Sequence, residues 1–190
     1  MKLIIVRHGQ TEENLEHIMM GHLPGKLTNE GIEQAKKLAL RLKDEKIDVI
    51  YSSDLKRAKD TTKEIIKYHS GIKVNFTKKL RETDFGSITG IKLKDVDWKN
   101  LPGDVETLNH LYLRGKNFLE KVYSKHKKDT VLFVCHGAIK GAIIGAILDK
   151  GPDYIKESAS IENASVSIFD INEDKKHIVH VINCVKHLRT

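Results

Sequence analysis

Near the N-terminus the chain reads Leu3-Ile4-Ile5-Val6-Arg7-His8-Gly9-Gln10-Thr11. Its four leading apolar residues predict a buried strand, because three of them are β-branched and β-branched side chains pack well on a pleated surface. Arg7 and His8 follow this strand directly. Ligands of open α/β sheets bind beyond the carboxyl ends of the strands, so polar chemistry is expected here. An arginine–histidine pair is also typical of a solvated loop, and the pair alone leaves both interpretations open.

Strand-like and helix-like patterns alternate along the rest of the chain. Apolar residues at three- to four-residue spacing predict helices at about 28–45, 55–66, 108–122 and 138–148. Short apolar runs predict strands at 47–51, 72–76, 129–135, 165–171 and 178–185. This alternation predicts an α/β fold: a three-layer αβα sandwich with a mostly parallel central sheet, helices on both faces and a C-terminal antiparallel hairpin.

Two local features of these helices can be predicted from residue type. We expect Thr28 to cap the first helix, and Ser53 or Asp54 to cap the second. In the fourth helix, glycines recur every four residues at 137, 141 and 145. We expect them to let that helix approach the sheet closely.

A second strand ends as the first one does, since the run 129–135 leads into His136-Gly137. Arg57 falls in the first turn of the second helix, where its side chain leans back toward the same edge of the sheet. Two histidines, two arginines and helix N-termini at one edge favour a phosphate ligand. Nearby positive charge disfavours a protonated imidazole, so His8 can offer a neutral attacking nitrogen. Glu82, in a glycine-punctuated loop, is the candidate acid for a leaving alcohol.

Other chemistries lack their sequence signatures. The chain has no His-Glu-x-x-His or Cys-x-x-Cys spacing for zinc, no phosphate loop of the NTPase type and no Gly-x-Ser-x-Gly. A cysteine phosphatase would need an arginine six residues after Cys135, where Gly141 stands. We therefore expect no metal and no cofactor. Cys135 and Cys184 lie in apolar runs and are interpreted as buried free thiols.

Length and composition bound the remaining properties. The 190 residues, 39% of them hydrophobic, fit one domain at 1–190, in which the weakly periodic segment 86–107 is an insertion over the active site. No apolar run approaches the roughly 18 residues of a membrane span, and the N-terminal run is too short for a signal peptide, so we expect no membrane partner and a cytoplasmic location. The net charge of +7 is spread along the chain, which favours a small anionic substrate over nucleic acid. A monomer and a homodimer both stay open.

The motifs resemble those of a known family. The run Arg7-His8-Gly9-Gln10-Thr11-Glu12-Glu13-Asn14 is similar to the Arg-His-Gly-x-Thr-x-x-Asn signature of the histidine phosphatase superfamily, also called phosphoglycerate mutase-like. Further segments resemble that family in the same order: 27–31, 52–58, 80–82, 134–137 and 163–165. The resemblance covers nearly the whole chain, although the family more often has serine at the position of Cys135.

By this resemblance, His8 is the nucleophile that becomes phosphohistidine. Arg7, Arg57 and His136 then hold the phosphoryl oxygens. Glu82 acts first as general acid and then as the base that activates water. The resemblance adds three residues to the phosphate site: Thr11, Asn14 and Gly137.

The same resemblance distinguishes hydrolysis from isomerisation. Mutases of the family typically read Arg-His-Gly-Glu-Ser-x-Trp-Asn, and Gln10, Thr11 and Glu13 depart from that pattern toward the phosphatase branch. We therefore predict a metal-independent phosphomonoesterase acting on a small phosphorylated metabolite. The alternatives are a phosphoglycerate mutase and a non-catalytic binder of phospho-ligands or nucleic acid. The run Val105-Glu106-Thr107, with Arg114 after it, departs from the family's Gly-Glu-Ser and leaves specificity open.

Overall fold

The computed structural model describes residues 1–158, 161–174 and 176–189. Within these ranges the chain forms one six-stranded sheet of order β3-β2-β4-β1-β5-β6. Its strands are β1 (Lys2–Arg7), β2 (Val49–Ser53), β3 (Lys73–Thr77), β4 (Thr130–Cys135), β5 (Val166–Asp170) and β6 (Ile178–Cys184). The pairs among β1 to β4 are parallel, whereas β5 pairs antiparallel with both β1 and β6.

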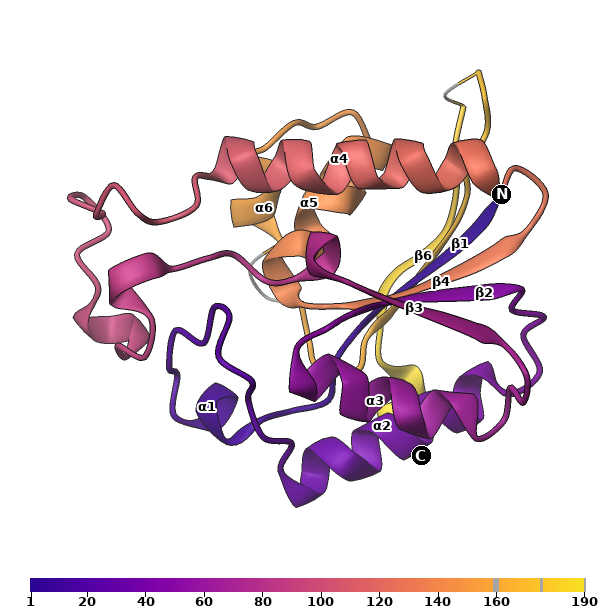
Figure 1. Ribbon diagram of the computed structural model, residues 1–190, viewed down its shortest axis with the longest axis horizontal. Coiled ribbons are helices and arrows are strands. Elements are labelled where there is room, and N and C mark those ends of the chain that lie inside the picture. Colours follow the sequence, from indigo (N-terminus) through magenta and orange to yellow (C-terminus); the bar gives the residue numbers. More distant parts are fainter. Residues whose placement is uncertain (159–160, 175, 190) are drawn as a thin grey trace.

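Helices cover both faces of this sheet, so the predicted three-layer αβα sandwich is confirmed (Figure 1). One face carries α2 (Asn29–Leu42) and α3 (Lys56–Ile66). The other carries α4 (Leu108–Lys125), α5 (Gly137–Ile147) and the short α6 (Tyr154–Glu157). The single-turn α1 (Glu12–Leu15) and the 3-10 turns lie in the connections; these turns are η1 (Lys78–Leu80), η2 (Gly86–Ile88), η3 (Leu93–Asp95) and η4 (Lys186–Leu188). None of the helices in the described ranges is long and apolar enough to cross a membrane.

Strand β1 supplies side chains to two separate cores. Leu3 and Ile5 pack with α4 and α5, while Ile4 and Val6 pack with α2 and α3. Successive side chains of a strand point to opposite faces, so a continuous apolar run is required where helices cover both. The central strand β4 divides its side chains between the two cores in the same way.

Two predicted details are wrong: the N-cap of α3 and the role of the glycines in α5. In each, the reason is a tertiary contact. Thr28 caps α2 as expected, its Oγ1 accepting from Gly31 N at 2.9 Å. The N-cap of α3 is instead Leu55, with no side-chain cap. The Asp54 carboxylate is engaged by the Arg81 guanidinium at 2.7 and 2.6 Å. Ser53 Oγ is bonded to the His136 ring at 2.8 Å.

The second corrected detail concerns the glycines of α5. A Cβ on Gly141 would lie 2.2 Å from Ser158 Oγ, and one on Gly145 would lie 2.9 Å from the Gly151 carbonyl oxygen. These glycines therefore allow α5 to pack against α6 and the turn before it, and not against the sheet.

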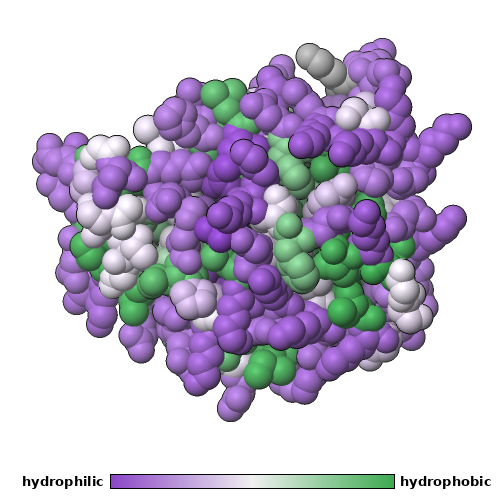
Figure 2. All heavy atoms as spheres, in the orientation of Figure 1, coloured by the Kyte–Doolittle hydropathy of each residue, from purple (hydrophilic) through white to green (hydrophobic). Residues whose placement is uncertain are grey.

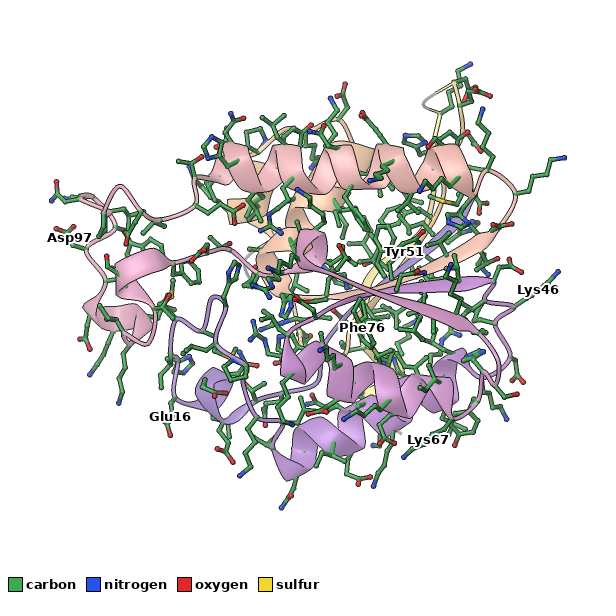
Figure 3. The ribbon with its side chains drawn as sticks, viewed as in Figure 1. Glu16, Lys46, Tyr51, Lys67, Phe76 and Asp97 are labelled. Carbon is green, nitrogen blue, oxygen red and sulfur yellow. The ribbon has the colours of Figure 1, made fainter. Side chains whose placement is uncertain are left out.

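The carboxyl ends of β1, β2 and β4 lie at one end of the sheet, where two long connections extend from it (Figure 1). One connection contains α1 and the other is the segment 86–107. Figure 3 shows Glu16 and Asp97 on these connections, far from Lys46 at the opposite end of the molecule. The first connection is fixed by close backbone contacts at two glycines. A Cβ on Gly9 would lie 2.2 Å from the Gly31 carbonyl oxygen, and one on Gly31 would lie 1.9 Å from the Gln10 carbonyl oxygen.

Candidate active site

Arg57 links the two histidines at the strand ends. Its Nε lies 3.2 Å from His8 Nε2 and 3.0 Å from His136 Nδ1. The centroids of the two imidazole rings are 5.0 Å apart, and all three side chains are buried. The structure thus brings together residues from the end of β1, the first turn of α3 and the end of β4.

The hydrogen bonds define the tautomer of each ring. His8 Nδ1 lies 2.7 Å from the Gly9 carbonyl oxygen, so Nδ1 carries the proton and Nε2 keeps its lone pair. His136 Nδ1 accepts from Arg57, while its Nε2 donates to Ser53 Oγ. Burial, together with the charge of Arg57, holds the pKa of both imidazoles well below the ordinary value. Both rings are therefore neutral at pH 7, and His8 Nε2 keeps the lone pair that a nucleophile would need.

Arg57 is itself held by backbone carbonyls. Its Nη1 donates to the Leu23 oxygen at 2.5 Å, and its Nη2 donates to the Gly21 oxygen at 2.9 Å. Burial lowers the pKa of Arg57 to about 10, which leaves the guanidinium charged at pH 7. The side chain has no freedom to rotate away from the histidines without breaking these bonds.

Arg7 lies beside this group with an unused donor. Its Nη1 donates to the Ile161 carbonyl, but among the described residues its buried Nε has no hydrogen-bond partner. A Cβ on Gly137 would come within 3.7 Å of both Arg7 Nε and Glu82 Oε2. The absence of a side chain at Gly137 leaves space between a cation and a carboxyl group at the N-terminus of α5, where an oxyanion is favoured.

Glu82 caps that same helix N-terminus. Both carboxylate oxygens lie 3.2 Å from Ala138 N, and Oε1 also accepts from Thr83 N at 2.9 Å. The carboxyl group is thereby fixed facing Arg7 across Gly137.

A charged pair that sequence reasoning did not assign holds the loop of Glu82. Arg114 Nε and Nη2 bind the two Glu106 oxygens at 2.8 and 2.7 Å. Arg114 Nη2 also donates to the Glu82 carbonyl at 3.1 Å. The sequence marked Glu106 and Arg114 only as a departure from the family pattern, because their spacing alone carries no pairing signal.

Thr11 and Asn14 hold each other in a capping box on α1. Thr11 Oγ1 accepts from Asn14 N, and Asn14 Oδ1 accepts from Thr11 N, each at 3.2 Å. Asn163, which lies in the family-like segment 163–165 but was given no role from the sequence, donates from Nδ2 to Asn14 Oδ1 and to the His8 carbonyl, both at 3.1 Å. These bonds position the His8 backbone, and direct phosphate binding by Thr11 and Asn14 stays a prediction.

The thiol of Cys135, a nearby nucleophilic group, is held in its unreactive protonated form. Cys135 is fully buried, and burial raises the pKa of its thiol to about 12. Cys184 is free and only partly buried, so the prediction of buried free thiols holds fully for Cys135 alone. Within the described ranges, no three His, Cys, Asp or Glu side chains are grouped to hold a metal ion.

The family profile described as "Histidine phosphatase superfamily (branch 1)" matches residues 3–184. The chain belongs to that superfamily. It is 32% identical to the metal-independent phosphoserine phosphatase of Arabidopsis thaliana, over 98% of this chain and 83% of the relative. It is 34% identical to phosphoserine phosphatase 1 of Hydrogenobacter thermophilus, over 99% and 94%. The fold matches that of Bacillus stearothermophilus YhfR with a TM-score of 0.90, 24% identity and 98% of each chain covered.

These comparisons agree with the predicted enzyme class. Relatives matched over most of their length carry phosphatase names, which together with the superfamily supports a phosphatase that hydrolyses phosphoric esters. The alternative of a phosphoglycerate mutase is not favoured.

Proposed function

We propose that this chain hydrolyses phosphomonoesters of small metabolites without a metal, through a phosphohistidine on His8. The observation that carries the proposal is the pair of hydrogen bonds from Arg57 Nε to His8 Nε2 and His136 Nδ1. They leave one unprotonated nitrogen beside buried cations, which is what attack on a phosphate dianion requires. The metal-independent phosphoserine phosphatase among its relatives supports the same chemistry.

In the first half-reaction, His8 Nε2 exchanges its bond from Arg57 for a bond to phosphorus. The P–O bond to the leaving alcohol breaks as N–P forms, and Glu82 gives its proton to the departing oxygen. Arg7 and Arg57 receive the charge that develops on the phosphoryl oxygens. The unpartnered Nε of Arg7 is suited to this, because a buried donor gains most when an anion arrives. The one N–H of neutral His136 is bonded to Ser53 Oγ, so His136 would join them by taking up a proton on Nδ1 as the anion arrives.

In the second half-reaction, water attacks the phosphorus of phosphohistidine. The Glu82 carboxylate, held by Ala138 N and Thr83 N, takes a proton from that water. The N–P bond breaks, His8 Nε2 recovers its lone pair, and inorganic phosphate leaves.

The test is hydrolysis of para-nitrophenyl phosphate in the presence of EDTA, with the phosphoenzyme trapped by rapid quench. We expect turnover to survive EDTA and to disappear in His8→Ala, together with an acid-labile phosphoenzyme. Turnover retained in His8→Ala would refute the proposal. Conversion of 3- to 2-phosphoglycerate with a bisphosphate primer would indicate a mutase instead.

We also propose a cytoplasmic location and a small phosphorylated substrate in preference to nucleic acid. The two free cysteines support a reducing compartment. A monomer and a homodimer are both compatible with this chemistry, since the proposed residues come from one chain.

A further inference from the structure

A cavity of about 900 Å³ opens beside Arg7, Glu82 and Gly137. We call it the apolar chamber; most of its wall consists of hydrophobic side chains, Met19, Phe85, Leu93, Trp98, Leu101, Pro102, Val105, Leu108 and Ile155. Its volume lies within the range of about 300 to 1,000 Å³ that suits a small organic ligand. The chamber is continuous with the proposed phosphate site, because Arg7, Glu82 and Gly137 line both.

Charged groups in the chamber wall are few. Apart from Arg7, whose free Nε the proposed function assigns to the phosphoryl group, they already have partners. Among the described lining residues the cations are Arg7 and Lys156. Lys156 is exposed at the surface, and its Nζ lies 3.4 Å from Asp153 Oδ1. The Glu106 carboxylate is bound by Arg114 at two atoms. A substrate with its own carboxylate or ammonium next to the phosphate would lose hydration here without gaining a dedicated counter-ion.

Several of the apolar wall residues are exposed to solvent. Trp98 is 53% exposed, Leu93 46% and Leu101 41%. Figure 2 shows apolar and intermediate residues gathered at the left end of the view, where the segment 86–107 lies. Exposed hydrophobic residues that are scattered singly over a surface are normal. A contiguous apolar surface beside a polar site is instead typical of a ligand-binding wall.

We propose that the apolar chamber receives the leaving group, so that the preferred substrates are phosphomonoesters of apolar alkyl or aryl alcohols. This inference rests on the proposed function, because it concerns the leaving-group side of the same reaction. It separates this chain from a phosphatase built for a phosphorylated amino acid or sugar acid. The phosphoryl group lies against Arg7 and Arg57, and the hydrocarbon extends from Glu82 toward Trp98 and Leu101.

The test uses ethyl, butyl and hexyl phosphate, whose leaving alcohols have similar acidity, with phosphoserine as the charged comparison. Each methylene that enters the chamber should raise kcat/KM by up to about fourfold. Hexyl phosphate should therefore exceed ethyl phosphate by at least tenfold and should exceed phosphoserine. A flat alkyl series, or phosphoserine hydrolysed faster than hexyl phosphate, would overturn the inference.

A wall variant gives the second measurement. Trp98→Ala should lower the hexyl-to-ethyl ratio of kcat/KM by about tenfold, because the longer alkyl chain loses a large apolar contact with the indole. The control is Tyr68→Ala, an aromatic residue that is 51% exposed just beyond α3, and it should leave the ratio unchanged. An unchanged ratio in Trp98→Ala contradicts the chamber's role.

His8→Ala distinguishes the two proposals. If wild-type enzyme hydrolyses all the esters at similar rates and His8→Ala hydrolyses none, the chamber inference fails while the proposed function stands. If hydrolysis persists in His8→Ala, the proposed function itself fails.

Discussion

The phosphate end and the apolar chamber adjoin each other but are built in opposite ways. At the phosphate end, His8, Arg57 and His136 are buried and sit at strand ends or in a first helical turn. The chamber wall takes Leu93, Trp98, Leu101, Pro102 and Val105 from the segment 86–107, which contains two 3-10 turns and exposed apolar side chains. The difference matches the two proposed tasks: regular elements fix the groups proposed to transfer the phosphoryl group, and an irregular segment shapes the proposed leaving-group site.

The largest expected effect is at the phosphate end. Arg57→Lys keeps the charge but removes the planar fork that reaches both histidines and two carbonyls. We expect kcat for ethyl and hexyl phosphate to fall together by about 10²- to 10³-fold. Arg41→Lys is the matched control, because Arg41 lies on α2 and forms an ion pair with Glu45 at 3.4 Å. A fall for one ester alone would mean that Arg57 serves selectivity and not the transfer step.

The next effect concerns packing and compares a glycine from each region. Gly31→Ala would push a methyl group against the Gln10 backbone, and we expect the free energy of unfolding to drop by about 1–3 kcal/mol. Gly103→Ala, in the chamber wall, meets no atom within 4 Å and should leave it nearly unchanged. Denaturant unfolding of both variants measures the contrast. Equal losses would show that the two regions are packed equally tightly.

A smaller effect, measured as the change in the free energy of unfolding per pH unit, tests the electrostatic cost of burying Lys140. Lys140, on α5, is fully buried and binds Ser165 O and Oγ at 3.0 and 2.9 Å. Burial lowers its pKa to about 7, against about 10.4 in an unfolded chain. Between these values the unfolded chain holds a proton that the folded chain has released, so this group makes stability rise with pH by up to about 1.4 kcal/mol per unit. Below pH 7 both states are protonated and this contribution no longer changes.

Unfolding of wild type and Lys140→Met in urea at pH 7, 8 and 9 isolates that contribution. As the pH rises, the free energy of unfolding of wild type should increase relative to that of Lys140→Met. Parallel pH profiles for the two proteins would show that Lys140 keeps its proton in the folded state.

The two regions also differ in how much of their structure could be predicted from the sequence. The ends of β1 and β4, and the reach of Arg57, follow from residue type, period and the lean of helical side chains, which are local properties. The cap of α3 was mispredicted because Arg81, distant in sequence, binds Asp54. The Glu106–Arg114 pair and the chamber depend on how an aperiodic segment folds over its neighbours, and no local pattern encodes that.

Arg57 also connects the two regions. Its guanidinium holds the carbonyls of Gly21 and Leu23, and the residues just before them pair with the chamber wall through Met19 N to Ile91 O at 2.8 Å and Leu93 N to His17 O at 2.7 Å. A phosphoryl group that displaced Arg57 would therefore strain the backbone that carries the wall. We accordingly expect the binding free energies of the two halves of a substrate, measured separately, not to sum to that of the intact ester.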